Sequence, residues 1–409
     1  MVRRPSTGPA LILLARLAEV PPDSMDIRFL DRPADLDELT HRLADTRRLA
    51  LDLEAAGFHR YSDQVCLVQL TLGEETYILD PFTLPVGELL RPPLEDERVE
   101  VVMHGADFDM RLLDRDLGIR PRGLFDTQVA ASLLGIEGIG LSSLLERTLG
   151  VELSKKYQRA DWARRPLPSA MLEYAALDTY HLFSLADRLC VELEEADRLA
   201  WAVEGFRALE EVRHEEPEDT DPVARVRAAR KMSPREAQRL REALAWRDVV
   251  AQERDRAPFR VANDSVLVQV ALQAPQSVAA LEDLQGFSGS LAQERGQELV
   301  SRIAAVDALP DGELQGYPRQ ERGGRGRMDP EVEDRMKRLK AVRNRKAEEL
   351  GIARGTLFPN ALLEAIAELV PGSVAEMEGV PGLQEWQREV LGPELMEEMQ
   401  VAPVADAGR

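Results

Sequence analysis

The stretch that decides the fold is LALDLEAAGF, at residues 49–58. Residues 47–53 form an apolar run that ends in an acidic pair, and this pattern predicts a buried strand. Because side chains alternate between the faces of a strand, Asp52 and Glu54 point the same way. Two like charges on one face of a core strand repel each other and lose solvation. The pair therefore indicates either a cation held between the two groups or a strand end that is open to water.

The length of 409 residues predicts two or three domains. A hydrophobic fraction of 44% and a charged fraction of 31% are typical of a soluble globular protein. No apolar run approaches the ~18–20 residues that a membrane span needs. Residues 1–25 combine basic residues with a short apolar run, and we expect a leader before the first strand, with Met25 as an alternative start.

Two cysteines, Cys66 and Cys190, exclude a disulfide framework and a thiolate zinc site, and a reducing cytoplasm is the expected compartment. The net charge of −21 argues weakly against nucleic-acid binding. However, residues 225–260 contain eleven basic and five acidic side chains, a local net charge of +6, and residues 319–346 have the same tally. These segments would either bind a polyanion or form ordinary amphipathic helices with solvated arginines.

The hydrophobic pattern of the N-terminal half predicts an α/β domain with a mixed sheet. Three consecutive strands with short connections predict an antiparallel meander, and strand–helix alternation follows it. The predicted strands are residues 27–30, 47–53, 64–72, 76–79 and 99–103, and the predicted helices are residues 35–44, 106–116, 125–134, 141–149 and a helical stretch from 169 to about 209.

The C-terminal half predicts only helices. PQSVAALEDLQGF at 275–287 resembles PGSVAEMEGVPGL at 371–383, with an offset of 96 residues, so we expect two related helical modules. The expected organisation is a leader at 1–25, an α/β domain at 26–209, an acidic linker at 210–228, a helical domain at 229–308, a Gly/Arg-rich linker at 309–328 and a second helical domain at 329–402.

Further acidic residues stand near predicted helices. Asp107 and Asp109 lie near a helix start in VVMHGADFDMRLL, 101–113, where capping is the alternative role. Tyr174 and Asp178 lie four apart on one helical face, where a simple hydrogen bond between them is the alternative.

Four acids in an apolar setting have a chemical use together, and they are Asp52, Glu54, Asp109 and Asp178. Two Mg²⁺ ions need hard oxygen ligands, and a pair of ions about 3.5–4 Å apart can hold both the attacking and the leaving oxygen of a phosphodiester displacement. Tyr174 is a candidate to orient or deprotonate the attacking water.

These segments resemble the three motifs of the DEDD 3′–5′ exonucleases. Asp52-x-Glu54 is similar to the first motif, His104 through Asp109 to the second, and Tyr174-x-x-x-Asp178 to the third in its tyrosine form, the DEDDy subclass. Two further stretches, FDTQVAASLLG at 125–135 and LSKKYQRADWARRPL at 153–167, narrow the resemblance to the ribonuclease D family. Residues 235–305 resemble an HRDC domain, and residues 330–400 resemble a second, more diverged copy.

The resemblance implies an RNase H-like exonuclease domain followed by two all-α HRDC-like domains. It implies a 3′–5′ exoribonuclease that releases 5′-mononucleotides from RNA with a free 3′ end, tRNA precursors included. Apart from the resemblance, we expect a monomer. It also implies two divalent ions, Mg²⁺ or Mn²⁺, with Asp52 bridging both, Glu54 approaching the terminal 3′ hydroxyl and Tyr174 holding the nucleophilic water. His104 is expected to support the site rather than to bind metal.

Other residues are candidates for substrate contact. Phe58 and Tyr61 follow the first motif, where an aromatic ring can stack on the last base, although core packing is an equal alternative for Phe58. Lys155, Arg159 and Arg164 are candidates for phosphate contact, with a solvated surface as the alternative. Two other functions stay open: a DNA exonuclease of Werner type, and a nucleic-acid-binding scaffold without turnover.

Overall fold

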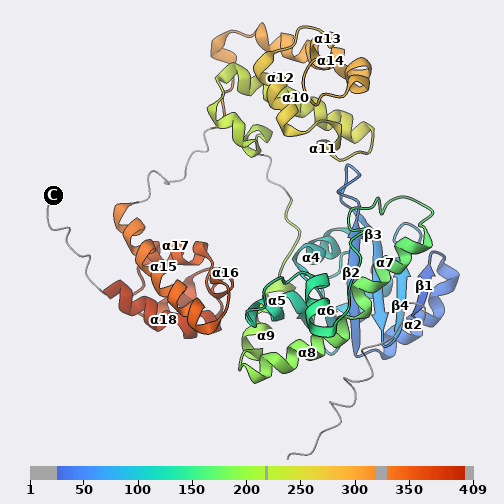
Figure 1. Ribbon diagram of the computed structural model, residues 1–409, viewed down its shortest axis with the longest axis vertical. Helices are drawn as coiled ribbons and strands as arrows, with labels where there is room; N and C mark the ends of the chain where they lie inside the picture. Colours follow the sequence, from blue (N-terminus) through green and yellow to red (C-terminus); the bar gives the residue numbers. More distant parts are fainter. Residues whose placement is uncertain (1–24, 217–219, 319–328, 401–409) are drawn as a thin grey trace, which may run out of the picture.

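The computed structural model describes residues 25–216, 220–318 and 329–400. A six-stranded sheet covered by helices comes first, and two groups of helices follow it (Figure 1). The predicted mixed α/β fold followed by all-α domains is confirmed. The predicted leader falls on residues 1–24, which lie outside the described residues. Among the described residues, no helix is long and apolar enough to cross a membrane.

The sheet has the strand order β1-β4-β3-β2-β5-β6. The strands are β1 (Asp26–Leu30), β2 (Arg48–Ala55), β3 (Val65–Leu72), β4 (Glu75–Leu79), β5 (Glu100–Met103) and β6 (Leu124–Asp126). The central strands β2, β3 and β4 form the predicted antiparallel meander, whereas the pairs β1–β4, β2–β5 and β5–β6 are parallel. Every residue of β3 is buried, which shows that both faces of the sheet are covered.

The helices of this part, which we call the sheet domain, follow the predicted order. They are α2 (Leu36–Asp45), α3 (Val86–Leu94), α4 (Asp107–Leu112), α5 (Thr127–Leu133), α6 (Leu141–Leu149), α7 (Ser169–Tyr180), α8 (Leu182–Glu195) and α9 (Leu199–Glu210). Figure 1 shows α7 lying across the sheet, where it packs against β2, β3 and β4.

Three local features differ from the prediction. The helix expected over 125–134 begins later, because β6 occupies its start and Asp126 caps α5. Helix α3 was missed, since Pro92 and Pro93 normally break a helix and here lie in its last turn. The long helical stretch from residue 169 is divided at His181, where α7 ends and α8 begins.

The first helical module has a hydrophobic core of its own. Its helices are α10 (Pro234–Glu253), α11 (Pro258–Val261), α12 (Asp264–Gln273), α13 (Val278–Glu282) and α14 (Gly289–Asp307). This core also includes Val223, Val226 and Ala229, so it takes in part of the expected acidic linker. At the other end, the Tyr317 hydroxyl donates a hydrogen bond to the Ala224 carbonyl at 3.2 Å.

The second helical module packs directly on the sheet domain. Its helices are α15 (Pro330–Leu350), α16 (Arg354–Leu357), α17 (Asn360–Leu369) and α18 (Glu385–Gln400), and their buried side chains join the main core of the sheet domain. Trp201 of α9 stacks on Trp386 of α18 with ring centroids 4.6 Å apart. Glu204 accepts hydrogen bonds from the backbone N–H groups of Glu385 and Trp386, which caps the start of α18.

Gly135 offers a test of this packing. A Cβ atom at Gly135 would overlap the carbonyl oxygen of Gly351, and the backbone there has a φ of +73°. We therefore expect Gly135→Ala to separate the second helical module from the sheet domain and to lower the melting temperature by several degrees, since 1 kcal/mol corresponds to roughly 2–4 °C at this size. Small-angle scattering and calorimetry measure both effects. Gly150→Ala is the matched control, because Gly150 also has a positive φ, +70°, and no atom lies within 4 Å of its added Cβ; equal behaviour of the two variants would contradict the prediction.

Candidate active site

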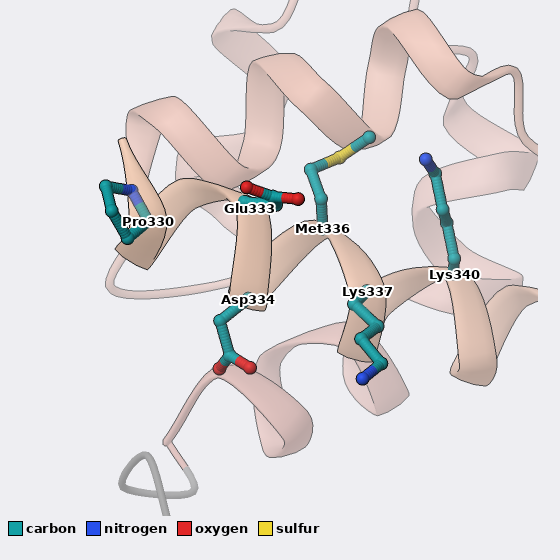
Figure 2. A pocket seen from close by; sticks show the side chains of 6 residues that line it. All are labelled: Pro330, Glu333, Asp334, Met336, Lys337 and Lys340. Atoms are coloured by element: carbon teal, nitrogen blue, oxygen red, sulfur yellow. The ribbon is translucent and has the colours of Figure 1, made fainter. Parts of the chain in front are cut away.

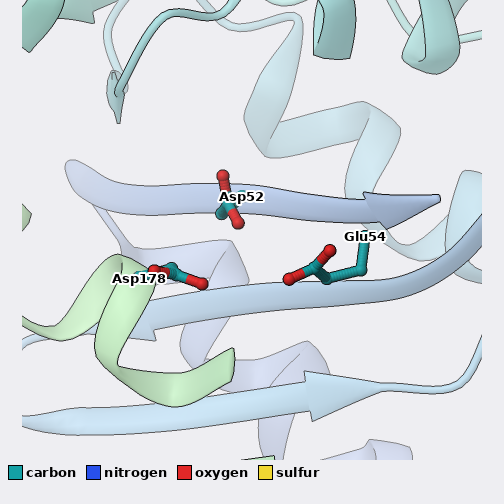
Figure 3. A group of neighbouring side chains, drawn as sticks. All are labelled: Asp52, Glu54 and Asp178. Carbon is teal, nitrogen blue, oxygen red and sulfur yellow. The ribbon is translucent and has the colours of Figure 1, made fainter. Parts of the chain in front are cut away.

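Three of the predicted acidic residues converge in the structure. Oxygen atoms of Asp52, Glu54 and Asp178 lie within 4.8 Å of one another. Figure 3 shows the two carboxylates of β2 and the carboxylate of α7 turned toward the same space. The alternation of side chains along β2 explains why the first two share a face. The register between β2 and β3 shifts just after Glu54, and such a bulge bends the strand and re-aims its last side chain.

Buried hydroxyl groups fix the position of α7 on the sheet. Thr179, the residue after Asp178, shares a hydrogen bond of 2.8 Å with Thr71 of β3, which in turn bonds Thr76 of β4 at 2.9 Å. All three threonines are completely buried. An unpaired buried hydroxyl is costly, so these two hydrogen bonds favour one position of α7 along its axis. They thereby set the position of Asp178.

Asp109 is buried near the start of α4. It is not among the three residues whose oxygen atoms lie within 4.8 Å of one another, but its charge acts on Asp52 and Glu54. Its helix is anchored by Asp126, whose carboxylate accepts a hydrogen bond of 2.7 Å from the Ala106 N–H and also caps α5 through Gln128 and Val129. One buried carboxylate thus ties the start of α4 to the end of β6. The adjacent Asp107 is exposed and paired with Arg111 at 3.2 Å.

The four predicted ligands have strongly perturbed acidities. Burial raises the pKa of Asp52 well above its ordinary value, and the neighbouring charges of Asp109, Asp178 and Glu54 raise it further. Burial and then the charges of Asp178 and Asp109 likewise raise the pKa of Glu54. Burial raises the pKa of Asp109 to about 8, with a contribution from Asp126, and the pKa of Asp178 to about 7. At neutral pH these carboxyl groups are therefore not all ionised unless a cation compensates their charge.

The donor set fits hard divalent cations. Carboxylate oxygens that converge in a poorly solvated place are the ligands that Mg²⁺ and Mn²⁺ take. Gln69 supports this fit, because it is fully buried, lies opposite Asp52 in the β2–β3 register and has no hydrogen-bond partner for either side-chain polar atom. Buried amides of this kind are rare, since each unpaired polar group costs about 1–3 kcal/mol. The sequence analysis missed Gln69, although a glutamine in an otherwise apolar strand was a visible signal.

Tyr174 lies one helical turn from Asp178 and is surrounded by aromatic rings. The ring centroids of Tyr157 and Trp162 lie 5.7 and 6.1 Å from that of Tyr174. Burial raises the pKa of Tyr174, and the charges of the nearby carboxylates raise it further, so the phenol keeps its proton. His104 is half-buried, and its Nδ1 atom lies 2.9 Å from the Thr127 hydroxyl oxygen.

The predicted substrate residues lie on exposed surfaces near this site. Phe58 and Tyr61 are 39% and 37% exposed, so the core-packing alternative for Phe58 is wrong. Lys155, Arg159 and Arg164 are also exposed. The guanidinium of Arg159 lies 5.6 Å from the centroid of the Phe58 ring, which joins these two candidates in one cluster.

The segment that carries the three basic candidates is firmly attached to the sheet. Arg165 pairs with buried Asp80 and donates to the Cys66 carbonyl at 2.8 Å. Arg60 and Asp161 form a two-bond ion pair with distances of 3.0 and 3.1 Å. These contacts hold the segment beside α7 while its exposed cations stay in solvent.

A separate hollow on α15 has no comparable chemistry. Its lining mixes acidic and basic side chains, and Figure 2 shows Asp334 and Lys337 pointing to one side of the helix while Met336 and Lys340 point to the other. The side chains do not converge on one point, so this hollow does not compete with the acidic cluster as a site.

Comparisons with known proteins agree with this geometry. Residues 27–194 match the model of the 3′–5′ exonuclease family, and residues 236–303 and 332–399 each match that of the HRDC domain. Ribonuclease D of Xanthomonas oryzae pv. oryzae is 33% identical over 374 residues, covering 90% of this chain and 97% of that protein. The chain belongs to the ribonuclease D family. It is a 3′–5′ exoribonuclease whose sheet domain is the exonuclease domain and whose helical modules are HRDC domains.

Three solved structures are similar to this one in fold. A protein from Bifidobacterium adolescentis has a TM-score of 0.77 and 26% identity, covering 94% of this chain and 99% of that one. Escherichia coli RNase D has a TM-score of 0.66 and 26% identity, with coverages of 93% and 100%. The catalytic core of RRP6 from Trypanosoma brucei has a TM-score of 0.63 and 28% identity, with coverages of 72% and 83%.

The raised acidities predict how stability depends on pH without metal. Between the ordinary pKa of Asp178 and its folded value of about 7, the folded protein holds a proton that the unfolded chain has released. The free energy of unfolding therefore falls as pH rises through this window. We expect Asp178→Asn to remove part of this slope and to stabilise the chelated protein at pH 8 by on the order of 1–2 kcal/mol.

Calorimetry in chelator from pH 5 to pH 8 measures this difference between variant and parent. Asp107→Asn is the control, because Asp107 is exposed and lies outside the cluster. Identical pH slopes for Asp178→Asn and the parent would refute the electrostatic interpretation. Added Mg²⁺ should raise the melting temperature of the parent more at pH 8 than at pH 6, since protons compete with the cation.

Proposed function

We propose that this enzyme hydrolyses the last phosphodiester of an RNA strand with two divalent cations, Mg²⁺ or Mn²⁺, held by Asp52, Glu54, Asp109 and Asp178. The observation that carries the proposal is the convergence of three of these carboxylates within 4.8 Å, with buried Asp109 raising the pKa of Asp52. When bound, the cations would stabilise charge on the scissile phosphate and lower the pKa of a water molecule. Asp52, central in β2, is the residue suited to contact both.

The remaining groups would orient the reactants. Tyr174 keeps its phenolic proton, so its role would be to hold the attacking water by a hydrogen bond rather than to remove its proton. Glu54 stands at the end of β2, and its carboxylate would accept a hydrogen bond from the terminal 3′ hydroxyl. Release of one 5′-mononucleotide would leave a new 3′ hydroxyl for the next cycle.

The proposed substrate is RNA with a free 3′ end, with tRNA precursors as the physiological class. The related Escherichia coli enzyme is described as an exoribonuclease involved in structured RNA processing, which supports this choice. We also propose that the enzyme acts as a monomer in the cytoplasm, where both free cysteines, Cys66 and Cys190, would stay reduced.

The adjacent pair Asp107 and Asp109 provides a matched test of the metal ligands. Asp109→Asn should lower the rate of nucleotide release by about 10²–10⁴, because it removes several kcal/mol of stabilisation at the charged centre. Asp107→Asn should keep parental activity, since Asp107 is exposed and paired with Arg111. Release of mononucleotides from 3′-labelled RNA, with and without chelator, measures both. Comparable activity of the two variants would exclude Asp109 as a ligand.

Matched RNA and DNA strands distinguish the proposal from a Werner-type DNA exonuclease. We expect faster release from RNA, because Glu54 and its surroundings would contact the terminal ribose and the 2′ hydroxyl is the group that distinguishes RNA from DNA there. Rates on a single-stranded RNA and on the DNA of the same sequence, at saturating Mg²⁺, give the ratio. A DNA rate equal to or above the RNA rate would favour the DNA exonuclease, and metal-independent RNA binding without cleavage of either strand would favour the scaffold.

A further inference from the structure

The loop at residues 57–63, which directly follows β2, contacts the first helical module. Figure 1 shows α11 beside this loop. The Ala257 N–H donates to the His59 carbonyl at 3.1 Å, and the Tyr61 hydroxyl donates to Asp248 at 3.1 Å. Arg60 also pairs with Asp255 at 3.3 Å. The loop that leaves the metal-binding strand is therefore shared between the two parts of the enzyme.

Two phenylalanine rings from the two parts meet at this contact and stay exposed. The ring centroids of Phe58 and Phe259 lie 5.5 Å apart, and the residues are 39% and 49% exposed. A packing contact between domains would normally cover such rings, because exposed apolar area costs about 25 cal/mol per Å². Neighbouring exposed aromatic side chains instead mark a surface that binds a partner.

Two arginines, one from each part, lie over the Phe58 ring. The guanidinium of Arg159 lies 5.6 Å from the Phe58 centroid, and that of Arg260 lies 5.4 Å from it. Neither arginine has a carboxylate partner among the described residues, whereas neighbouring Arg60 and Arg254 are both ion-paired. The free cations thus stand beside the exposed rings, which is the combination that binds single-stranded nucleic acid.

We propose that Phe58, Arg159, Phe259 and Arg260 form one binding site for a nucleotide of single-stranded RNA near its 3′ end. The base would stack on the exposed Phe259 ring, since both guanidinium groups already lie over the Phe58 ring, and these two groups would contact the flanking phosphates. Only four residues separate Phe58 from Glu54, a span of at most about 14 Å along the backbone. A strand whose last nucleotide lies at the acidic cluster would therefore reach this site within a few nucleotides.

This inference rests on the proposed function for the identity of the substrate, but it adds a site that neither domain contains alone. Each part supplies one ring and one cation, so bound RNA would bridge the exonuclease domain and the first helical module. Tyr61 would have a structural role rather than contact RNA, because its hydroxyl donates a hydrogen bond to Asp248 and so joins the loop to α10.

The stacking part of the proposal is tested by binding without catalysis. Fluorescence anisotropy of a 5′-labelled single-stranded RNA with the full-length protein in chelator gives the affinity. Phe259→Leu, which keeps apolar bulk but loses the ring, should weaken binding about tenfold, and Phe259→Tyr should retain it. Leu272→Ala is the control, because Leu272 is an exposed apolar residue of the same module. Equal affinities for the two Phe259 variants, whether weakened or parental, would overturn the stacking site.

The electrostatic part is tested by salt dependence. Removing one phosphate contact lowers the slope of log K against log salt by about 0.7 for a single strand. Arg260→Ala should show this loss, whereas Arg254→Ala, which removes an arginine paired with Glu294 in the same module, should not. Equal slopes for both variants would overturn the phosphate contact. Because both assays run without metal, failure of the catalytic proposal and failure of this one are separate results.

Discussion

The rest of the structure depends on holding mutually repelling carboxylates in a poorly solvated place. Without a cation, burial raises the pKa values of all four acids, and like charges raise those of Asp52, Glu54 and Asp109 further. Such a cluster destabilises the folded state. The surrounding structure must therefore contribute the stabilising free energy that offsets it. The supports are buried polar groups on separate elements: the threonine chain beneath α7 and the Asp126 caps of α4 and α5. These hydrogen bonds fix the backbone that carries Asp178 and Asp109.

The sequence predicted those parts of the site that follow from local periodicity. Alternation along β2 placed Asp52 and Glu54 on one face, and helical spacing placed Tyr174 with Asp178. Neither rule reports which elements meet, so the grouping of the four acids rested on their shared use as ligands of hard cations and on the resemblance to a family. Gln69 was beyond both rules, because its burial opposite Asp52 depends on the register between two strands. The mixed sheet was predictable from the order of strands and helices. Strand β6 was missed, because three residues are too few to show an alternating pattern.

The two HRDC domains were predicted as related modules, yet they are attached in different ways. The second shares the hydrophobic core of the exonuclease domain, and Trp201 stacks on Trp386 between them. The first keeps its own core and meets the exonuclease domain through ion pairs and hydrogen bonds of an exposed loop. Exposed polar contacts contribute about 0–1 kcal/mol each. The first module is thus the part that can adjust to a substrate without disturbing the catalytic core.

This difference resolves an apparent conflict between an acidic chain and a polyanionic substrate. Of the eleven basic residues in 225–260, five are paired with carboxylates within the first module, and the six others have no ion-pair partner among the described residues: Arg225, Arg227, Arg230, Lys231, Arg256 and Arg260. Binding of a phosphate backbone depends on such free cations and not on the total charge. Acidic surfaces elsewhere would repel RNA and so favour the places where free cations and exposed rings occur together. The loop after β2 is such a place, and the strand that supplies it also supplies Asp52 and Glu54.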